Sequence, residues 1–213
     1  MAEDENRLDN RVLRDAVYEH IREMIENNEF PLDEKINKID LAKKFNVSST
    51  PINDALNRLV GEHYLVQRNR KGYYVREYDA KEMRDFFEMR AALEGLAASL
   101  VCQRANDEDI TRLTTMFDGF SSPIPESRRI EYVETDQRFH RTILEKSGNK
   151  LILDAAESTG FLWRSYQKGL VRNMETSFKE HKEIIVALKE RDGVLAQKKM
   201  MSHLLRSSRE YDV

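Results

Sequence analysis

The stretch IDLAKKFNVSSTPINDALNRL, residues 39–59, predicts two helices joined by a tight turn. The first helix is expected over about residues 38–45. Ser48 is a favourable N-cap residue, and Pro51 falls in a first helical turn, where its missing N–H is not needed. A second helix is therefore expected over about residues 49–60, and the short connection is typical of a helix-turn-helix.

The second of these helices has one apolar and one polar face. Side chains three and four positions apart lie on the same side of a helix, so the two kinds of residue separate cleanly. We expect the apolar face to be buried and the polar face to be available to a partner. The apolar set is Ile52, Ala55, Leu56 and Leu59, and the polar set is Thr50, Asn53, Asp54 and Asn57.

The flanking segments extend this unit to a winged helix-turn-helix. Residues 10–28 carry apolar side chains at three- and four-residue steps, which predicts an amphipathic helix that ends before Pro31. Residues 64–67 and 73–76 predict two short strands joined by a basic hairpin tip. The order helix, helix, turn, helix, basic hairpin is typical of a DNA-binding domain.

The charge distribution favours the same segment as the one that meets nucleic acid. The whole chain has a formal net charge of −3, which argues against a non-specific nucleic-acid binder. Residues 1–34 have 4 basic and 11 acidic side chains, whereas residues 35–76 have 9 basic and 3 acidic ones. Charge alone fits an unevenly charged solvated surface equally well.

Residues 79–213 have long helical patterns with almost no strand signal, which predicts an all-helical bundle. We therefore expect a mainly α protein of two domains, a winged helix-turn-helix over residues 1–78 and an antiparallel helical bundle over residues 79–213. The helices of the bundle are expected over residues 79–104, 107–120, 126–147, 150–170, 175–191 and 193–211.

Other compositional features limit the class of protein. No apolar run approaches the roughly 20 residues that span a bilayer, and the acidic N-terminus does not resemble a signal or transit peptide. The single cysteine, Cys102, excludes an internal disulfide and lies in an alanine-rich stretch that favours a buried, inert thiol. We expect a cytoplasmic protein that does not contact a membrane.

Three histidines and an aspartate in the bundle are candidate metal ligands. Asp136 precedes His140 by four residues, so both side chains project from one side of a helix, about 40° apart. His181 and His203 lie on two later helices and can converge with them if those helices pack together. Such a set suits zinc, nickel or manganese. The spacing alone fits histidines that serve only in packing as well.

Two other functions are compatible with these residues. A metal-dependent hydrolase would use Glu180 or Glu183 as general base, although no HExxH motif and no Gly-x-Ser-x-Gly motif is present. A DNA-binding protein that has lost ligand sensing would keep its histidines only as packing residues.

The motifs together resemble a known family over nearly the whole chain. Residues 39–59 and the wing ending RKGYYV, residues 70–75, match the N-terminal domain of GntR-family regulators. MRAALE at 89–94, DQRFH at 136–140, SGN at 147–149, Glu180-His181 and His203 match the C-terminal domain, called FCD, of the FadR subfamily. The chain is thus similar to a dimeric regulator whose DNA binding responds to a small molecule.

This resemblance implies roles for the residues of the bundle. It implies that Asp136, His140, His181 and His203 form the family's metal site, with zinc as the expected metal and nickel or manganese as alternatives. It also implies that Arg90 faces the same cavity, where a buried guanidinium would attract a small organic acid or related anion. The alternative for Arg90 is an internal ion pair with Glu94, four residues along the helix.

The recognition helix departs from the family pattern. Related proteins usually have Ser-Arg-Thr-Pro-Val-Arg-Glu here, whereas this chain has Ser49 and Asn53 at the two arginine positions. Asn53 could bond the N6/N7 edge of an adenine, which predicts an operator that leans toward A·T. The expected DNA contacts are Lys38, Ser49, Thr50, Asn53, Asn57, Arg58, Arg70 and Lys71.

The sequence interpretation is therefore a homodimer, held mainly through its helical domains, that binds near-palindromic double-stranded operator DNA. A small organic acid bound among the bundle helices would control operator affinity. No catalytic residue is assigned.

Overall fold

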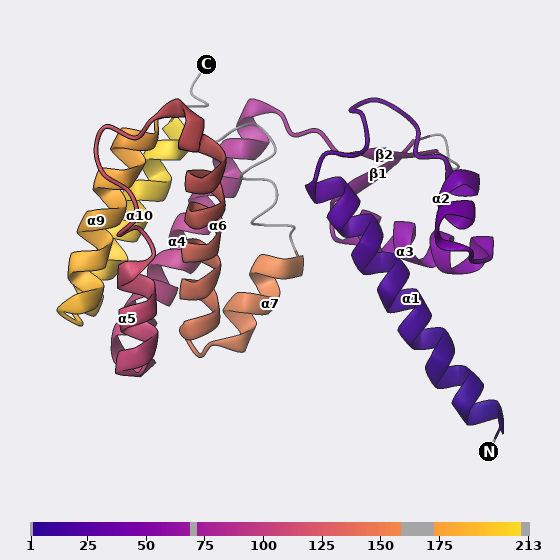
Figure 1. The fold of residues 1–213 in the computed structure, drawn as a ribbon, viewed down its shortest axis with the longest axis horizontal. Helices are drawn as coiled ribbons and strands as arrows, with labels where there is room; N and C mark the ends of the chain where they lie inside the picture. The colour runs from indigo at the N-terminus through magenta and orange to yellow at the C-terminus, as the bar shows by residue number, and fades with distance from the viewer. Residues whose placement is uncertain (1, 69–71, 159–172, 210–213) are drawn as a thin grey trace. The chain divides into compact units, whose positions relative to one another are not determined.

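The computed structural model describes residues 2–68, 72–158 and 173–209 (Figure 1). The chain divides into two compact units, residues 1–77 and residues 78–213. The first unit is a winged helix-turn-helix and the second is entirely helical in its described part. The fold class predicted from the sequence is confirmed.

The first unit contains three helices and a two-stranded antiparallel sheet. Helix α1 begins at Ala2, eight residues before the predicted start at Asn10. The mostly polar residues before Asn10 show no apolar periodicity, so the sequence pattern did not predict this first part of the helix. Helix α3 ends at Gly61, one residue beyond the predicted end. The elements are α1 (Ala2–Glu26), α2 (Lys38–Phe45), α3 (Ser49–Gly61), β1 (Leu65–Arg68) and β2 (Gly72–Val75).

Local contacts fix the ends of α2 and α3. The Asn37 side chain accepts a hydrogen bond from the Ile39 amide at 3.0 Å and so caps α2. Asn46 ends α2 in the left-handed conformation, with φ of 52°. Ser48 occupies the N-cap position of α3, although its side chain makes no capping hydrogen bond within the described residues. Pro51 lies buried in the first turn of α3, as predicted.

The apolar faces of α1 and α3 form the core of this unit. Ile21, Ile52, Leu56 and Leu59 are fully excluded from solvent. The predicted separation of α3 into an apolar and a polar face is confirmed, because Asp54 and Asn57 are exposed and Asn53 is half-buried. This packing orients α3 so that its polar side chains point away from the core.

The wing pairs Leu65 with Val75 and Arg68 with Gly72. Its strands are each displaced by one residue from the predicted ranges 64–67 and 73–76. Tyr73, near the start of β2, is only 4% exposed and packs into the first unit. The wing is therefore anchored to the helices beneath it.

The second unit is built around the antiparallel pair α4 and α10. A Cβ atom on Gly95 of α4 would lie 2.5 Å from Met201 Cγ, and one on Gly193 of α10 would lie 2.9 Å from Ser99 Oγ, so both glycines allow close approach. Helices α6 and α9 pack against this pair (Figure 1). The elements are α4 (Ala80–Arg104), α5 (Asp107–Thr115), η1 (Glu126–Arg128), α6 (Arg129–Lys146), α7 (Lys150–Ser158), α9 (Met174–Lys189) and α10 (Gly193–Arg209).

Two predicted helices of the bundle differ from the observed ones. The helix expected over 107–120 ends at Thr115, and Phe117 and Phe120 pack into the core from the turns that follow. The helix expected over 150–170 is seen as α7 up to Ser158, and the remainder lies outside the described residues.

Cys102 is buried, as the sequence analysis predicts. Its Sγ lies 3.9 Å from the Ala187 carbonyl oxygen, and burial raises the pKa of the thiol. No helix in the described ranges has the length and hydropathy needed to cross a membrane.

Candidate metal centre and DNA-contacting face

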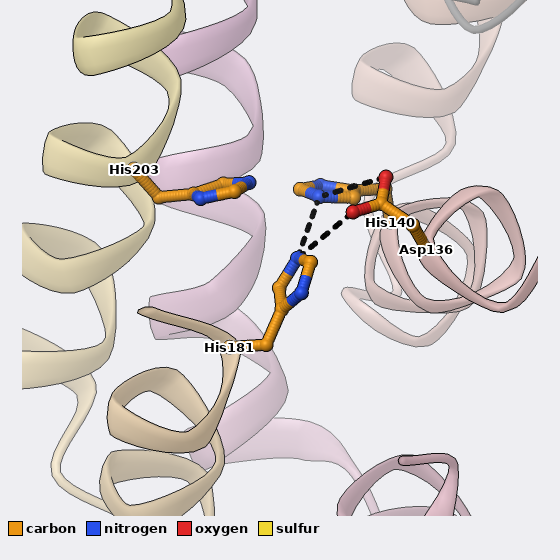
Figure 2. A group of neighbouring side chains, drawn as sticks. All are labelled: Asp136, His140, His181 and His203. Carbon is orange, nitrogen blue, oxygen red and sulfur yellow. Dashed lines mark hydrogen bonds and ion pairs between the residues drawn. The ribbon is translucent and has the colours of Figure 1, made fainter. Parts of the chain in front are cut away.

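Four buried side chains from three helices converge in the second unit (Figure 2). Asp136 and His140 lie one turn apart on α6, His181 lies on α9, and His203 lies on α10. Each offers one ligand atom, and these atoms all lie within 4.8 Å of one another. The structure thus brings together the four residues singled out from the sequence.

The inward-facing atoms of this cluster are an oxygen pair and imidazole nitrogens. His181 Nε2 lies 3.2 Å from His140 Nε2 and 3.4 Å from Asp136 Oδ1. His140 Nε2 lies 3.8 Å from Asp136 Oδ2. Nitrogen and oxygen donors in this number are the usual ligands of zinc and of related divalent ions.

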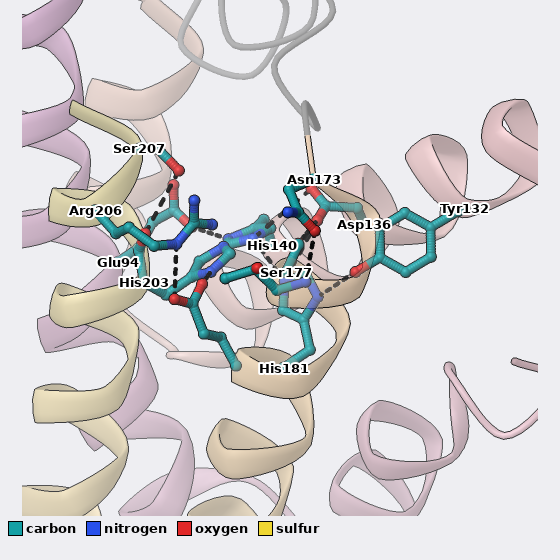
Figure 3. Close-up of polar contacts among 12 residues, drawn as sticks. Glu94, Tyr132, Asp136, His140, Asn173, Ser177, His181, His203, Arg206 and Ser207 are labelled. Carbon is teal, nitrogen blue, oxygen red and sulfur yellow. Dashed lines mark hydrogen bonds and ion pairs between the residues drawn. The ribbon is translucent and has the colours of Figure 1, made fainter. Parts of the chain in front are cut away.

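The outward nitrogen of each imidazole has a hydrogen-bond partner (Figure 3). This arrangement orients metal-binding histidines in proteins, because the partner fixes both the ring and the tautomer. The Nδ1 atoms of His140, His203 and His181 lie 2.5 Å from Glu94 Oε2, 2.7 Å from Glu180 Oε2 and 3.1 Å from Tyr132 Oη, respectively.

Two of these partners are ionised carboxylates. Burial on its own would raise the pKa of Glu94, but its interactions with Arg90 and His140 outweigh burial and lower it to about 2. The pKa of Glu180 is also lowered, since hydrogen bonds from His203 and Arg206 outweigh its burial. An ionised carboxylate only accepts hydrogen bonds, so Nδ1 of His140 and Nδ1 of His203 carry the protons.

Two of the three histidines, His181 and His203, are held in the neutral form that binds metals. Burial lowers the pKa of His181 well below 6.5, and the neighbouring rings His203 and His140 lower it further. Burial also lowers the pKa of His203, although its hydrogen bond to Glu180 opposes that effect. A neutral ring protonated on Nδ1 presents a lone pair on Nε2, so His140 and His203 in this form would direct buried lone pairs at one point. A cation satisfies such an arrangement, and the residues present fit a bound divalent metal.

Aromatic rings pack against His181 on one side of the cluster. The Phe117 ring stacks on His181 with centroids 4.6 Å apart, and the Phe139 ring meets His181 edge-on at 5.2 Å. Both phenylalanines are fully buried. Low polarity around the rings strengthens electrostatic interactions inside the cluster.

Arg90 is linked to the cluster through Glu94. The Arg90 side chain is 3% exposed, and its Nε donates to Glu94 Oε1 at 2.6 Å. Glu94 in turn holds His140 through its other oxygen. The internal ion pair, given above as the alternative for Arg90, is thus present, and it connects the guanidinium to a candidate ligand.

Sequence reasoning did not identify the residues that hold the histidines. Tyr132 lies on the same helix as His140, but its contact with His181 joins positions 49 apart in the chain. Glu180, the general base of the hydrolase interpretation and a member of the matched Glu180-His181 motif, binds His203 and Arg206 at 2.7 Å each. Glu183 pairs with Lys199 at 2.6 Å.

The polar face of α3 is the second candidate site. Ser49 and Thr50 are exposed at its N-terminus. Lys38 Nζ donates to Asn53 Oδ1 at 2.9 Å, and Tyr73 Oη donates to Asn57 Oδ1 at 2.7 Å. Five of the eight expected DNA contacts are therefore either exposed or hydrogen-bonded on or beside this face of α3.

Arg58, expected to contact DNA, is held against α1. Its guanidinium lies 3.7 Å from the centre of the Tyr18 ring, and it forms ion pairs with Glu62 at 3.0 Å and Asp15 at 3.4 Å. These contacts tie α3 to α1. Arg70 and Lys71, the two expected wing contacts, lie outside the described residues.

Known protein families match both units. The FCD domain family matches residues 85–206, more than half of the chain, and the gntR family of bacterial regulatory proteins matches residues 13–75. The chain belongs to the GntR family. Both matched domains are those of transcription regulators and not of enzymes, so the expectation of a non-enzyme is confirmed and the hydrolase interpretation has no support.

Individual GntR-family relatives agree with this assignment. YdhC, an HTH-type transcriptional regulator of Bacillus subtilis, is 27% identical over 190 residues, which cover 87% of this chain and 85% of YdhC. The Nta operon transcriptional regulator of Aminobacter aminovorans is 37% identical over 128 residues, or 59% of each chain. The structure of E. coli McbR/YncC has a TM-score of 0.74 at 15% identity, and the match covers 94% of this chain and 97% of that one. The GntR-family fold is thus present over nearly the whole length.

Proposed function

We propose that this GntR-family regulator is a homodimer whose affinity for operator DNA is controlled by a small carboxylic acid or related anion bound beside a divalent metal. Residues 1–78 are assigned to DNA binding, and residues 79–213 to effector binding and dimerisation. Asp136, His140, His181 and His203 would hold the metal, with zinc preferred and nickel or manganese as alternatives.

The observation that carries this proposal is the fixed orientation of the imidazoles. Nδ1 of His140 and Nδ1 of His203 are both committed to carboxylates, so their Nε2 lone pairs converge with Asp136 in a buried space. Unprotonated nitrogens that face one another in a buried space are costly unless a cation or a donated proton lies between them. When bound, the metal supplies positive charge and open coordination positions for a ligand oxygen.

The charges around the cluster support an anionic effector. Three carboxylates, of Glu94, Asp136 and Glu180, are accompanied by the two guanidinium groups of Arg90 and Arg206. A divalent cation among these formal charges leaves the site with an excess of positive charge, which favours a carboxylate or a related anion. Arg90 supplies one of these charges from the helix that faces α6.

Control of DNA binding follows from a difference in effector affinity between two dimer poses. Ligand contacts to α4, α6, α9 and α10 would favour one arrangement of the helical domains, and therefore one spacing of the two α3 helices. Two recognition helices of a dimer bind successive major grooves only when their spacing matches the DNA repeat. Ser49, Thr50, Asn53 and Asn57 on α3, with Lys38, Arg58, Arg70 and Lys71, are the proposed DNA contacts.

The experiment that tests the metal assignment is elemental analysis of tag-free protein. We expect about one divalent ion per chain in the wild type, and loss of that ion in Asp136→Ala and His181→Ala. His20→Ala is the matched control, because His20 is an exposed histidine on α1 of the first unit. Absence of metal from every preparation, after incubation with zinc, nickel and manganese, would support the packing interpretation instead.

Effector control is tested by fluorescence anisotropy with a DNA duplex selected by the protein. We expect members of a panel of small carboxylic acids to change operator affinity in the metal-loaded wild type and to have no effect in Asp136→Ala. A size-exclusion measurement of mass tests the dimer. Equal operator affinity with and without every acid would contradict effector control.

A further inference from the structure

A lysine, an asparagine and a tyrosine from three elements meet on the exposed side of α3. Lys38 begins α2, Asn53 lies on α3, and Tyr73 lies on β2. Lys38 Nζ donates to Asn53 Oδ1 at 2.9 Å and lies 5.5 Å from the centre of the Tyr73 ring. The ammonium group is thus held between an amide oxygen and an aromatic face.

This contact determines how the Asn53 amide is turned. A lysine ammonium has only donors, so it must face the amide oxygen and not the amide nitrogen. Nδ2 of Asn53 therefore points away from Lys38, and it has no protein partner within the part of the chain that the structure describes. Lys38 and Asn53 together present hydrogen-bond donors to whatever approaches this face.

The surrounding residues preserve this arrangement. Asp54 pairs with Arg14 at 3.3 Å, and Asp40 accepts from Asn37 at 2.6 Å, so the nearby carboxylates on α2 and α3 have partners other than Lys38. Tyr73 is 4% exposed, which makes the surface under the ammonium rigid. The positive charge of Lys38 therefore stays available beside Asn53.

A surface that offers only hydrogen-bond donors favours guanine over adenine in the major groove. Adenine offers an acceptor, N7, and a donor, the N6 amino group, so an asparagine reads it with both its oxygen and its nitrogen. Guanine offers two acceptors, N7 and O6, in the same places. With the Asn53 oxygen engaged by a cation, an adenine amino group would meet a lysine ammonium, whereas guanine would meet donors at both positions.

We propose that Lys38 and Asn53 together recognise a guanine base. The pair would take the role of the arginine that related proteins usually have at the position of Asn53. This inference rests on the proposed function, since it requires the polar face of α3 to enter the major groove of operator DNA. It reverses the base preference expected from Asn53 alone, because that expectation did not include the contact with Lys38.

The test is selection of bound duplexes from random DNA by the full-length wild type and three variants. In the wild type we expect one guanine per half-site that depends on both residues, and Asn53→Ala should weaken the preference for it. Lys38→Met frees the Asn53 oxygen, so the same position should change from guanine to adenine, with a shift in relative affinity of about 5- to 100-fold. Circular dichroism confirms that each variant is folded.

Lys43→Met is the matched control, because Lys43 is an exposed lysine of the same helix. It should leave the selected sequence unchanged and at most weaken binding to all duplexes equally. The inference is overturned if the wild type selects adenine at the Asn53-dependent position, or if Lys38→Met lowers affinity without changing base preference. Failure of the wild type to enrich any sequence would instead overturn the proposed function, and the inference with it.

Discussion

Substitution of Glu94 by glutamine replaces one carboxylate oxygen by an NH₂ group. We expect it to destabilise the helical domain more than any other single-atom replacement in the cluster. Glu94 is completely buried between Arg90 and His140, and its two oxygens accept from Arg90 Nε at 2.6 Å and His140 Nδ1 at 2.5 Å. Glutamine keeps the shape but has one oxygen and one NH₂ group. One of the two buried donors would therefore face another donor, and Arg90 would lose its counter-ion.

The magnitude follows from two independent arguments. The pKa of Glu94 is lowered from 4.5 to about 2, and at about 1.4 kcal/mol per pH unit this corresponds to roughly 3 kcal/mol of stabilisation of the folded state at neutral pH. Removing one partner of a buried ion pair costs about 3–5 kcal/mol in other proteins. We expect Glu94→Gln to lower the free energy of unfolding of the helical domain by about 3 kcal/mol, or its Tm by about 10 °C.

The measurement is calorimetric and urea-induced unfolding of the metal-free full-length chain at pH 7. Zinc affinity is measured in parallel and should fall about 10- to 100-fold, because Glu94 orients His140. Glu88→Gln is the control, since Glu88 is an exposed glutamate of the same helix. The reasoning is refuted if Glu94→Gln unfolds within 1 kcal/mol of the Glu88→Gln control, or if both variants bind zinc as tightly as the wild type.

Three further outcomes are expected. The pKa values of His181 and His203 are lowered in the folded state, so the unfolded chain takes up protons first as pH falls. The metal-free protein should therefore lose stability below about pH 6.5, by at most about 1.4 kcal/mol per pH unit for each of these residues, and a flat urea midpoint between pH 6.5 and 5 would contradict this. Gly193→Ala should lower the free energy of unfolding by about 1–3 kcal/mol, because the new Cβ would lie 2.9 Å from Ser99 Oγ and 3.2 Å from the Ser99 carbonyl oxygen. Gly61→Ala is the control in the same thermal melt and should be tolerated, because nothing lies within 4 Å of its Cβ. Arg191→Met should lower the free energy of unfolding by about 1–3 kcal/mol, because Arg191 donates to the carbonyl oxygens of Cys102 and Ala105 at 3.1 and 2.9 Å at the end of α4. An unchanged melting temperature would show that water replaces the guanidinium group at these carbonyl oxygens.

The local features of the fold could be predicted from the sequence because they depend on neighbouring residues. The apolar spacing of α3, the first-turn Pro51 and the terminating Asn46 all act within one or two helical turns, and the structure agrees with each. The start of α1 could not be predicted, because the residues before Asn10 are mostly polar and show no apolar periodicity. The early end of α5 was missed as well, because Phe117 and Phe120 continue the apolar pattern while packing from turns.

The candidate site could be predicted only in part, for a related reason. The α6 pair Asp136 and His140 is visible in the spacing, but the groups that orient the histidines come from distant positions. Glu94 contacts His140 across 46 residues, and Glu180 contacts His203 across 23. The packing of the helices determines which carboxylate contacts which imidazole ring, and these contacts cannot be predicted from the local sequence.

The assignment of the metal site is tested most directly by X-ray absorption at the zinc edge on zinc-loaded, tag-free protein. The account predicts three imidazole nitrogens and carboxylate oxygen at about 2.0–2.2 Å, with the imidazole signal reduced in His181→Ala. A shell of sulfur, or of oxygen alone without imidazole scattering, would contradict it.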